Sequence, residues 1–284
     1  MRVMVFGAAG MLGHMLLRVL ALDPRYEVFG TIRGAVDRYP QLAAYRARIF
    51  DHVDVADQSH VGRLVERVAP DAVINAVAVR AAGAGSASTA DFVHANALWP
   101  HQIAAVTEGL GIRLCHISSD GVFSGQKGQY SEDDQPDPCD LYSAAKFVGE
   151  PAGKNVLTLR TSIIGPELNG SSGLLSWLLG QSGPIKGYSR WLYSGFTTLE
   201  LAHIFRDHIL CRDGLDGIYH IAADSISKFE LLKLMADIYD HRIDIVEDSG
   251  IVKDRTLNAD RFGKATGYHP PSWPEMISAL RHFG

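Results

Sequence analysis

Cysteine, basic charge and long apolar runs are all scarce in this sequence of 284 residues. Its three cysteines, at positions 115, 139 and 211, are too few and too scattered for a disulfide framework or a zinc site. The 27 lysines and arginines are outnumbered by 32 aspartates and glutamates, which disfavours a basic surface for nucleic acid. No apolar run reaches the roughly 18 residues that span a bilayer, so no membrane partner is expected.

Signals for export and for metal binding are also lacking. An expected strand begins at residue 2 and a glycine turn follows it, which leaves no room for a signal peptide. The 12 histidines form no H-E-x-x-H or equivalent cluster, so we expect no metal. Hydrophobic residues make up 46% and charged residues 21%, as in ordinary folded domains. These features predict a soluble, cytoplasmic protein of one large or two closely joined domains.

Short apolar runs alternate with amphipathic stretches through the first part of the chain. The expected strands cover residues 2–6, 26–32, 47–50, 72–75, 112–117 and 155–160. The expected helices cover residues 11–21, 57–68, 88–109 and 142–150. This alternation predicts βαβ units, and right-handed crossovers then give a Rossmann-like, doubly wound parallel α/β sheet. Ligands of such a sheet bind outside the carboxyl ends of its strands.

The remainder of the chain loses this rhythm. Glycine and serine are dense at 165–195, which favours loops around a ligand. Helices are expected at 199–210, 227–240 and 272–282, and strands at 217–222 and 242–246. Ser227 and Glu230 form a capping box for the second of these helices. We therefore expect a dinucleotide-binding domain at 1–165 and a smaller, mainly substrate-binding α/β part at 166–284 that shares its core.

A glycine turn joins the first expected strand to the first expected helix. Residues 7–13 read G-A-A-G-M-L-G, with the spacing G-x-x-G-x-x-G. Glycine permits a tight turn and close approach of backbone to a pyrophosphate, to which the helix N-terminus donates N–H groups. Such spacing also occurs in merely compact turns, but its place between a strand and a helix favours dinucleotide binding.

The residues after the second and third expected strands bear on which dinucleotide binds. NAD-selective folds usually have an acidic residue at the end of the second strand. This chain has Arg33 there, which could pair with a 2′-phosphate and favours NADPH over NADH, although a solvated arginine is the simpler alternative. After the third strand, Asp54 and Val55 stand where a carboxylate could accept from the adenine amino group, while Asp57 could cap the next helix.

A tyrosine and a lysine lie four residues apart in the expected helix at 142–150. The motif Y-x-x-x-K puts Tyr142 and Lys146 on one helix face. A nearby ammonium stabilises a phenolate, so such a tyrosine can exchange a proton near neutral pH. Upstream, Ser119 follows the fifth expected strand, and its hydroxyl could donate to a carbonyl that gains negative charge.

Taken together and in this order, these motifs resemble the extended short-chain dehydrogenase/reductase superfamily. Within it the chain is most similar to the dTDP-4-dehydrorhamnose reductase family. The resemblance extends over much of the chain. It rests on the glycine turn, N-A-V-A at 75–78, Asn96, I-S-S-D-G-V-F-S-G at 117–125, Y-S-E-D at 130–133, Y-x-x-x-K, Gly149-Glu150 and R-T-S at 160–162.

The resemblance implies a reductase of a 4-keto-6-deoxy nucleotide sugar in polysaccharide precursor synthesis, with Ser119 polarising the ketone, Tyr142 as acid and Lys146 assisting it. With the strand-end residues above, the cofactor contacts that we expect, for NADPH with NADH as the alternative, are Gly7, Gly10, Met11, Leu12, Gly13, Arg33, Asp54, Val55, Asn75, Ala76, Val77, Asn96, Tyr142 and Lys146. The substrate contacts that we expect are Ser119, Asp120, Arg160, Trp177, Lys186, Trp191 and Arg255.

Two departures from the family pattern lie at expected sugar contacts. The family's D-Y-V-F reads D-G-V-F here, with Gly121 in place of tyrosine. Its R-T-S-W has Ile163 in place of tryptophan. Both changes leave the redox residues intact and put the rhamnose precursor itself in doubt, so we expect a related 4-keto sugar.

Two other functions are open. An epimerase or dehydratase of the same superfamily would share the fold, but dehydratases typically carry an Asp-Glu pair that Asp120-Gly121 lacks. A regulatory subunit, like that of methionine adenosyltransferase, would use the fold for partner binding, but the intact Ser119, Tyr142 and Lys146 favour catalysis. The helices at 88–109 and 142–150 could also form a homodimer interface.

Overall fold

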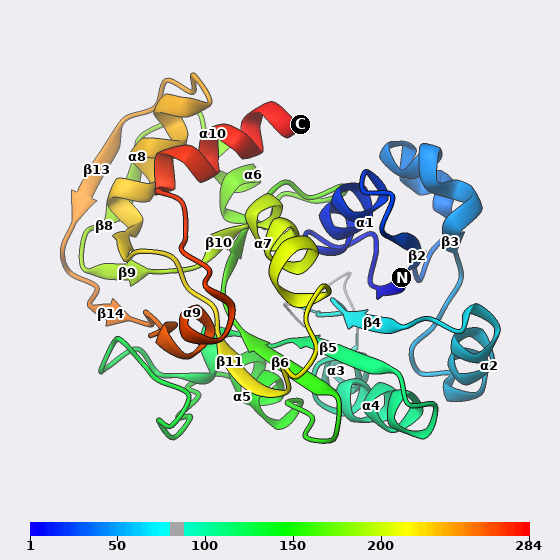
Figure 1. The fold of residues 1–284 in the computed structure, drawn as a ribbon. Coiled ribbons are helices and arrows are strands. Elements are labelled where there is room, and N and C mark those ends of the chain that lie inside the picture. Colours follow the sequence, from blue (N-terminus) through cyan, green and yellow to red (C-terminus); the bar gives the residue numbers. More distant parts are fainter. Residues whose placement is uncertain (80–87) are drawn as a thin grey trace.

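A seven-stranded parallel sheet organises the computed structural model, which describes residues 1–79 and 88–284 (Figure 1). Its order is β11-β6-β5-β4-β1-β2-β3. The strands are β1 Arg2–Phe6, β2 Glu27–Thr31, β3 Ile49–Phe50, β4 Ala72–Asn75, β5 Arg113–Ile117, β6 Val156–Arg160 and β11 Gly217–His220. The order reverses between β1 and β4, the point at which a doubly wound sheet binds ligands. The predicted Rossmann-like fold is confirmed.

Two helical layers cover the sheet, because successive side chains of a strand point to opposite faces. Val3 and Val5 of β1 belong to one core cluster, and Met4 and Phe6 belong to the other. The first cluster packs under helices α1 Gly13–Ala21, α7 Thr198–Ile204, α8 Lys228–Ile238 and α10 Trp273–Phe283. The second packs under α2 Gln58–Val68 and α4 Trp99–Gly109.

The predicted helix at 88–109 contains an irregular turn. It divides into α3 Thr89–Val93, the π-helical segment η3 His94–Leu98, and α4. Pro100 has no N–H and so cannot donate to the carbonyl of Asn96. In the π-helical segment, the Trp99 N–H donates to the carbonyl of His94, five residues earlier. The freed carbonyl faces α5 Leu141–Val148, where a Cβ on Gly149 would lie 2.0 Å from the Asn96 oxygen. Glycine therefore lets α5 pack closely on η3.

The second part of the chain adds small sheets beside the main one. Residues 165–195, expected as loops, contain α6 Leu174–Leu179, β8 Ile185–Tyr188 and β9 Trp191–Tyr193, so that expectation was wrong. β8 pairs with β13 Ile245–Asp248, and β9 pairs with β12 Ile226–Ser227 and β14 Lys253–Asp254. The remaining strands and α-helix are β7 Ile163–Ile164, β10 Phe196–Thr197 and α9 Asp260–Thr266. The chain also forms the 3₁₀ segments η1 Val36–Arg38, η2 Pro40–Arg48 and η4 Asp120–Val122, and the π-helical segment η5 Phe205–Ile209.

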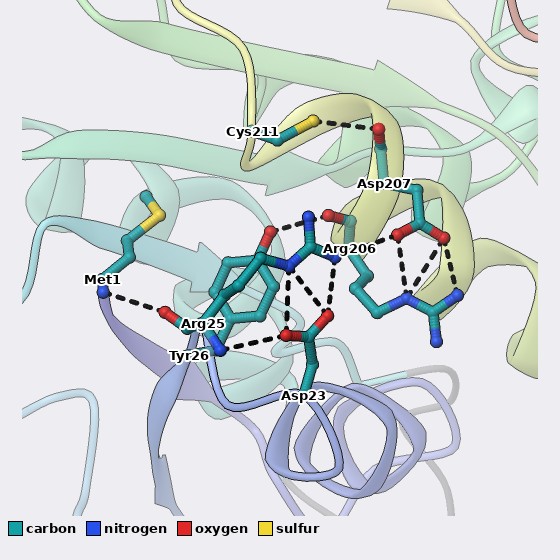
Figure 2. Close-up of polar contacts among 7 residues, drawn as sticks. All are labelled: Met1, Asp23, Arg25, Tyr26, Arg206, Asp207 and Cys211. Carbon is teal, nitrogen blue, oxygen red and sulfur yellow. Dashed lines mark hydrogen bonds and ion pairs between the residues drawn. The ribbon is translucent and has the colours of Figure 1, made fainter.

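The two parts share one body. β11 and α7 follow residue 165 in sequence, but β11 extends the main sheet and α7 packs on α1. Figure 2 shows a polar cluster that joins η5 to the turn before β2. The Tyr26 hydroxyl donates to the Arg206 carbonyl at 2.6 Å, and Arg25 pairs with Asp23 at 2.6 Å and with Asp207 at 3.3 Å.

Three observations bear on membranes, metals and thiols. Nowhere in residues 1–79 and 88–284 is a helix both long enough and apolar enough to cross a membrane. Over the same ranges, His, Cys, Asp and Glu side chains form no group of three that could hold a metal ion. Cys115 is buried in β5, whereas Cys139 and Cys211 are exposed, and all three are free thiols.

Candidate active site

The glycine turn lies against the end of β4. Gly7 has a φ of +85°, and a Cβ there would lie 3.0 Å from the Ala76 carbonyl oxygen. A Cβ on Gly13 would lie only 2.0 Å from the Gly7 oxygen, and the Gly10 N–H donates to that oxygen at 2.8 Å. The turn is thus a backbone cradle at the reversal point of the sheet, which suits a pyrophosphate beside the N-terminus of α1.

A cleft of about 830 Å³, here called the cofactor cleft, opens beside this turn. Of the predicted cofactor residues, it is lined by Gly7, Arg33, Asp54, Val55, Ala76 and Val77. Arg33 is exposed there. One oxygen of Asp54 accepts from the Ala56 N–H at 2.9 Å, and Asp57 caps α2 through the His60 N–H at 2.9 Å.

Asn75 and Asn96 do not line the cofactor cleft, because both side chains are buried below it. The Asn75 oxygen accepts from Trp99 Nε1 at 3.0 Å and from the Val77 N–H at 3.2 Å. The Asn96 amide donates to the Val79 carbonyl at 2.7 Å and accepts from the Val79 N–H at 3.2 Å. Both side chains therefore shape the backbone that lines the cleft.

A second cleft of about 420 Å³, the reaction cleft, joins the first through Ala76 and Val77. It brings together the three predicted catalytic residues, Ser119 from the end of β5 and Tyr142 and Lys146 from α5. The predicted contacts Met11, Leu12, Asp120 and Arg255 also line it. The Ser119 hydroxyl accepts from the Gly121 N–H at 2.9 Å and donates to Asp120 at 3.3 Å.

Lys146 is held between α5 and β5. Its side chain is almost fully buried, and its Nζ donates to the Ile117 carbonyl at 2.6 Å. Burial lowers the pKa of Lys146 to about 8, and the carboxylate of Glu150 opposes that shift. The ammonium form therefore persists at neutral pH one helical turn from Tyr142, where it can stabilise a phenolate.

Arg255 and Gly121 lie side by side in the lining of the reaction cleft. A Cβ on Gly121 would lie 3.0 Å from Ser119 Oγ and 3.6 Å from Arg255 Nη1. Among residues 1–79 and 88–284, the buried Nε and Nη2 of Arg255 find no hydrogen-bond partner, and its ion pair with Asp140 spans 3.8 Å. An unsatisfied buried guanidinium is costly, so this group suits a polar or anionic ligand in the cleft.

Asp120 is a second carboxyl group near Arg255, besides Asp140. Burial raises the pKa of Asp120, while the positive charges of Arg255 and Lys228 oppose the rise. Lys228 is itself buried, which lowers its pKa, and repulsion from Lys253 and Arg255 acts in the same direction. The reaction cleft therefore contains charges of both signs, with Lys146 and Arg255 facing the carboxyl groups of Asp120, Asp140 and Glu167.

A third cleft of about 460 Å³, the outer cleft, joins the reaction cleft through Ser162 and Ile163. The predicted contacts Trp177, Lys186 and Trp191 line it. Lys228 and Lys253, which the sequence did not indicate, have their Nζ atoms 4.4 Å and 5.1 Å from the centre of the Trp191 ring. Tyr188 stacks on the same ring at 5.8 Å.

Arg160 was predicted as a substrate contact, and the structure contradicts this. Its guanidinium lines none of the three clefts and is almost fully buried. It makes a bidentate ion pair with Glu150, at 2.8 Å and 2.7 Å, and lies over the Phe123 ring. An arginine in the R-T-S motif gives no sequence signal for whether it faces a ligand or an internal carboxylate.

Comparison with known proteins identifies relatives of the chain. Residues 1–183 match the RmlD substrate binding domain family. A probable low-salt glycan biosynthesis reductase of Haloferax volcanii is 26% identical over 241 residues, which cover 78% of this chain and 74% of the relative. A dTDP-4-dehydrorhamnose reductase of Burkholderia thailandensis is 33% identical over 167 residues, which cover 57% of this chain and 50% of the relative.

Solved structures share the fold over the full length. The dTDP-4-dehydrorhamnose reductase of Bacillus anthracis, solved in complex with NADP, matches with a TM-score of 0.80. The two sequences are 21% identical, and the match covers 100% of this chain and 99% of that one. At this identity the likeness establishes the common fold alone.

Proposed function

The chain belongs to the RmlD substrate binding domain family, and on that premise we propose that it is an NADPH-dependent reductase of a 4-keto-6-deoxy nucleotide sugar. The observation that carries this proposal is the joining of the three clefts. Ser119, Tyr142 and Lys146 line the middle cleft, which continues on one side to the glycine turn and on the other to the lysines around Trp191. The reaction would supply reduced sugars for polysaccharide precursors.

The cofactor fits the first cleft by its chemistry. The backbone of Gly7, Gly10 and Gly13 has the close packing that a pyrophosphate site needs, with Met11 and Leu12 between them at the reaction cleft. Arg33 offers a guanidinium to the 2′-phosphate. The Ala56 N–H binds Oδ1 of Asp54, and the other carboxylate oxygen is the one that would accept from the adenine amino group. When bound, NADPH supplies the hydride that reduces the ketone carbon.

The protein's own residues handle the ketone oxygen. Ser119 donates its hydroxyl proton in a hydrogen bond to the ketone, in place of the long bond to Asp120 at 3.3 Å. Tyr142 transfers its phenolic proton to the oxygen as the carbon is reduced, which completes the alcohol. Lys146 stabilises the resulting phenolate and is held for this task by the Ile117 carbonyl.

The nucleotide sugar finds cations in the reaction and outer clefts. A diphosphate carries two negative charges, and Arg255 of the reaction cleft and Lys228 of the outer cleft offer two positive charges, with Lys253 nearby at Trp191. Trp191 and Tyr188 offer a stacked aromatic surface beside these charges, which suits a base or a sugar face. The absence of a side chain at Gly121 favours a sugar that hydrogen-bonds to Arg255.

The test is turnover with defined substrates. Nucleotide-linked 4-keto-6-deoxy sugars, made in place by dehydratases, are mixed with the protein and NADPH, and the products are identified by NMR. We expect NADPH to be consumed in equal amount with a 4-hydroxy product. Turnover without added NADPH, by a cofactor that stays bound through purification, would identify an epimerase or dehydratase instead. Cofactor binding with no turnover of any sugar would favour the regulatory function.

We also propose a homodimer. Val93, Leu98, Leu141 and Val148 are exposed on the adjacent helices α3 to α5, an apolar surface that a second copy could cover. Sedimentation should give a dimer that Val148→Asp converts to a monomer. A monomeric wild-type protein at micromolar concentration would contradict the proposal.

A further inference from the structure

A buried ion pair lies directly behind the reaction cleft. Glu150 follows the C-terminus of α5, and both of its carboxylate oxygens accept hydrogen bonds. Oε1 accepts from Ser118 Oγ at 2.6 Å and from Arg160 Nε at 2.8 Å, and Oε2 accepts from Arg160 Nη2 at 2.7 Å. The side chains of Arg160 and Glu150 are 3% and 5% exposed, so the pair is inaccessible to a ligand.

This pair and Lys146 contact consecutive residues at the end of β5. Lys146 binds the carbonyl of Ile117, Glu150 binds the hydroxyl of Ser118, and the next residue is Ser119. Helix α5, which presents Tyr142 and Lys146, is therefore joined near its C-terminal end to the strand end that leads to Ser119. A shift of Glu150 would change the distance between the two groups that meet the ketone oxygen.

Arg160 is in turn fixed from behind. Its Nη1 donates to His220 Nε2 at 3.3 Å, and His220 Nδ1 donates to the Tyr130 carbonyl at 2.9 Å. Burial lowers the pKa of His220 to about 4, so the ring is neutral and accepts from the guanidinium at neutral pH. The network thus extends from β11 through β6 to the end of β5.

Glu150 also bears on the charge of Lys146. Burial lowers the pKa of Lys146 to about 8, and Glu150 is the carboxylate that counteracts this loss. Tyr142 on the same helix and His116 on β5 are further titratable groups of this region, and the Arg160 guanidinium, which binds both Glu150 oxygens, offsets part of the negative charge. Burial keeps the pKa of His116 well below its ordinary value, so this ring adds no positive charge at neutral pH.

We propose that Glu150 and Arg160 are positioning residues, which hold the strand end that carries Ser119 against α5. The proposal rests on the proposed reductase function, because it assigns roles within that site. It differs from an ordinary structural ion pair because Glu150 binds Ser118, which lies between the Ile117 carbonyl that holds Lys146 and the catalytic Ser119.

The test begins with Glu150→Gln, assayed for turnover against pH. We expect kcat to fall roughly tenfold or more, because small misplacements of reacting groups are costly. The Michaelis constant for NADPH should stay unchanged. Loss of the negative charge should also move the alkaline limb of the pH profile to lower pH, since less opposes the effect of burial on Lys146.

A second variant covers the chance that Glu150→Gln fails to fold, because it leaves Arg160 buried without a partner. In the double variant Glu150→Gln/Arg160→Met both charges are removed. We expect a folded protein with the same low kcat and a smaller shift of the limb in the same direction, because the positive charge of Arg160 is removed together with the negative charge of Glu150. Wild-type kcat and an unshifted limb in the folded double variant would overturn the proposal and leave the pair a purely structural one.

Two further variants separate the parts of the argument. Ser118→Ala removes one hydrogen bond but keeps the charge, so kcat should fall while the alkaline limb stays in place. Glu200→Gln is the matched control, because this carboxylate accepts from the Tyr268 hydroxyl at 2.8 Å on α7, outside the three clefts. It should leave both kcat and the pH profile unchanged.

A readout without turnover distinguishes failure of this proposal from failure of the proposed function. The titration of Lys146 is followed by NMR of the labelled side chain in the wild-type protein and in the double variant. A wild-type protein that reduces no sugar, but whose Lys146 titrates at higher pH than in the variant, would refute the reductase and retain the charge role of Glu150. Equal titration in the two proteins would refute that charge role whether or not turnover occurs.

Discussion

The cofactor cleft and the outer cleft are built in different ways. In the first, the cradle is backbone from one short stretch, where a Cβ on Gly7 or Gly13 would meet a carbonyl oxygen at 3.0 Å or 2.0 Å. In the second, the charged groups are side chains from separate elements. Lys228 begins α8 and Lys253 begins β14, and they meet at Trp191 of β9.

This difference shows which changes each region can absorb. A cradle made of backbone is defined by sterics, so one added methyl group disturbs it whatever its chemistry. A cluster of long side chains is defined by charge, so an isosteric neutral substitution removes its effect and leaves the fold in place. The reaction cleft lies between the two and depends on both regions.

The largest effect is expected where the two regions meet. Tyr142→Phe removes only the proton donor of the reaction cleft, so turnover should fall by about 10² to 10⁴-fold, the usual contribution of general acid catalysis. NADPH binding, measured by fluorescence titration, should be largely unchanged. Tyr219→Phe is the control. Tyr219 lies in β11, packs on Phe262 and lines none of the three clefts. Unchanged turnover in Tyr142→Phe would refute the mechanism.

Adding one methyl group to the glycine turn should impair the cofactor cleft, both in stability and in NADPH affinity. Gly13→Ala places a Cβ against the Gly7 carbonyl oxygen, and we expect the free energy of unfolding to fall by about 2 to 3 kcal/mol, as for other overpacked sites. NADPH affinity should fall with it. Gly62→Ala is the matched control, since nothing lies within 4 Å of its Cβ in α2.

The control variant should gain about 0.5 to 1 kcal/mol from the better helix propensity of alanine. Urea unfolding followed by circular dichroism measures both values. Equal changes in the two variants would contradict a steric role for Gly13.

Sequence reasoning succeeded where the determinants are local. The parallel sheet follows from short apolar runs between helices, and the glycine turn and Y-x-x-x-K pair each lie within a few residues. The caps of α2 at Asp57 and of α8 at Ser227 and Glu230 were also readable, because a cap involves residues three positions apart. The strands, turn, helix motif and caps among these features are each specified by residues that lie close together in the sequence.

The failures have a common physical cause. β8 and β9 are short and find their partners β13 and β14 much later in the chain, so no local pattern marked 165–195 as structured. Lys228 resembles any lysine at the start of a helix until Trp191 meets it. Arg160 lies in a motif near the site, but only the fold shows that Glu150 occupies its guanidinium.

Removing one positive charge from the outer cleft should weaken use of the nucleotide sugar. Lys228→Met keeps most of the side-chain volume and removes the cation beside Trp191, so kcat/KM for the nucleotide sugar should fall roughly tenfold. The constants for NADPH should not change, because the cofactor cleft is built from other elements. The free energy of unfolding should change little.

The control for this charge change is Lys233→Met on the same helix. Lys233 also lies over an aromatic ring, that of Phe229, but it lines none of the three clefts. Equal losses in the two variants, or a loss in NADPH binding, would show that Lys228 acts on the fold rather than on the substrate.

The smallest expected effect tests whether a charged side chain also matters in the cofactor cleft, whose cradle is defined by backbone packing. Arg33 lies in the cofactor cleft and is exposed, so Arg33→Ala should leave stability and NADH use unchanged. A lost charge-assisted hydrogen bond to a 2′-phosphate should raise the Michaelis constant for NADPH roughly tenfold. Arg48→Ala, also exposed but outside the cleft, controls for general loss of positive charge. Equal losses with NADPH and NADH would show that Arg33 does not read the phosphate, and selection of the cofactor would then rest on the backbone of the cleft alone.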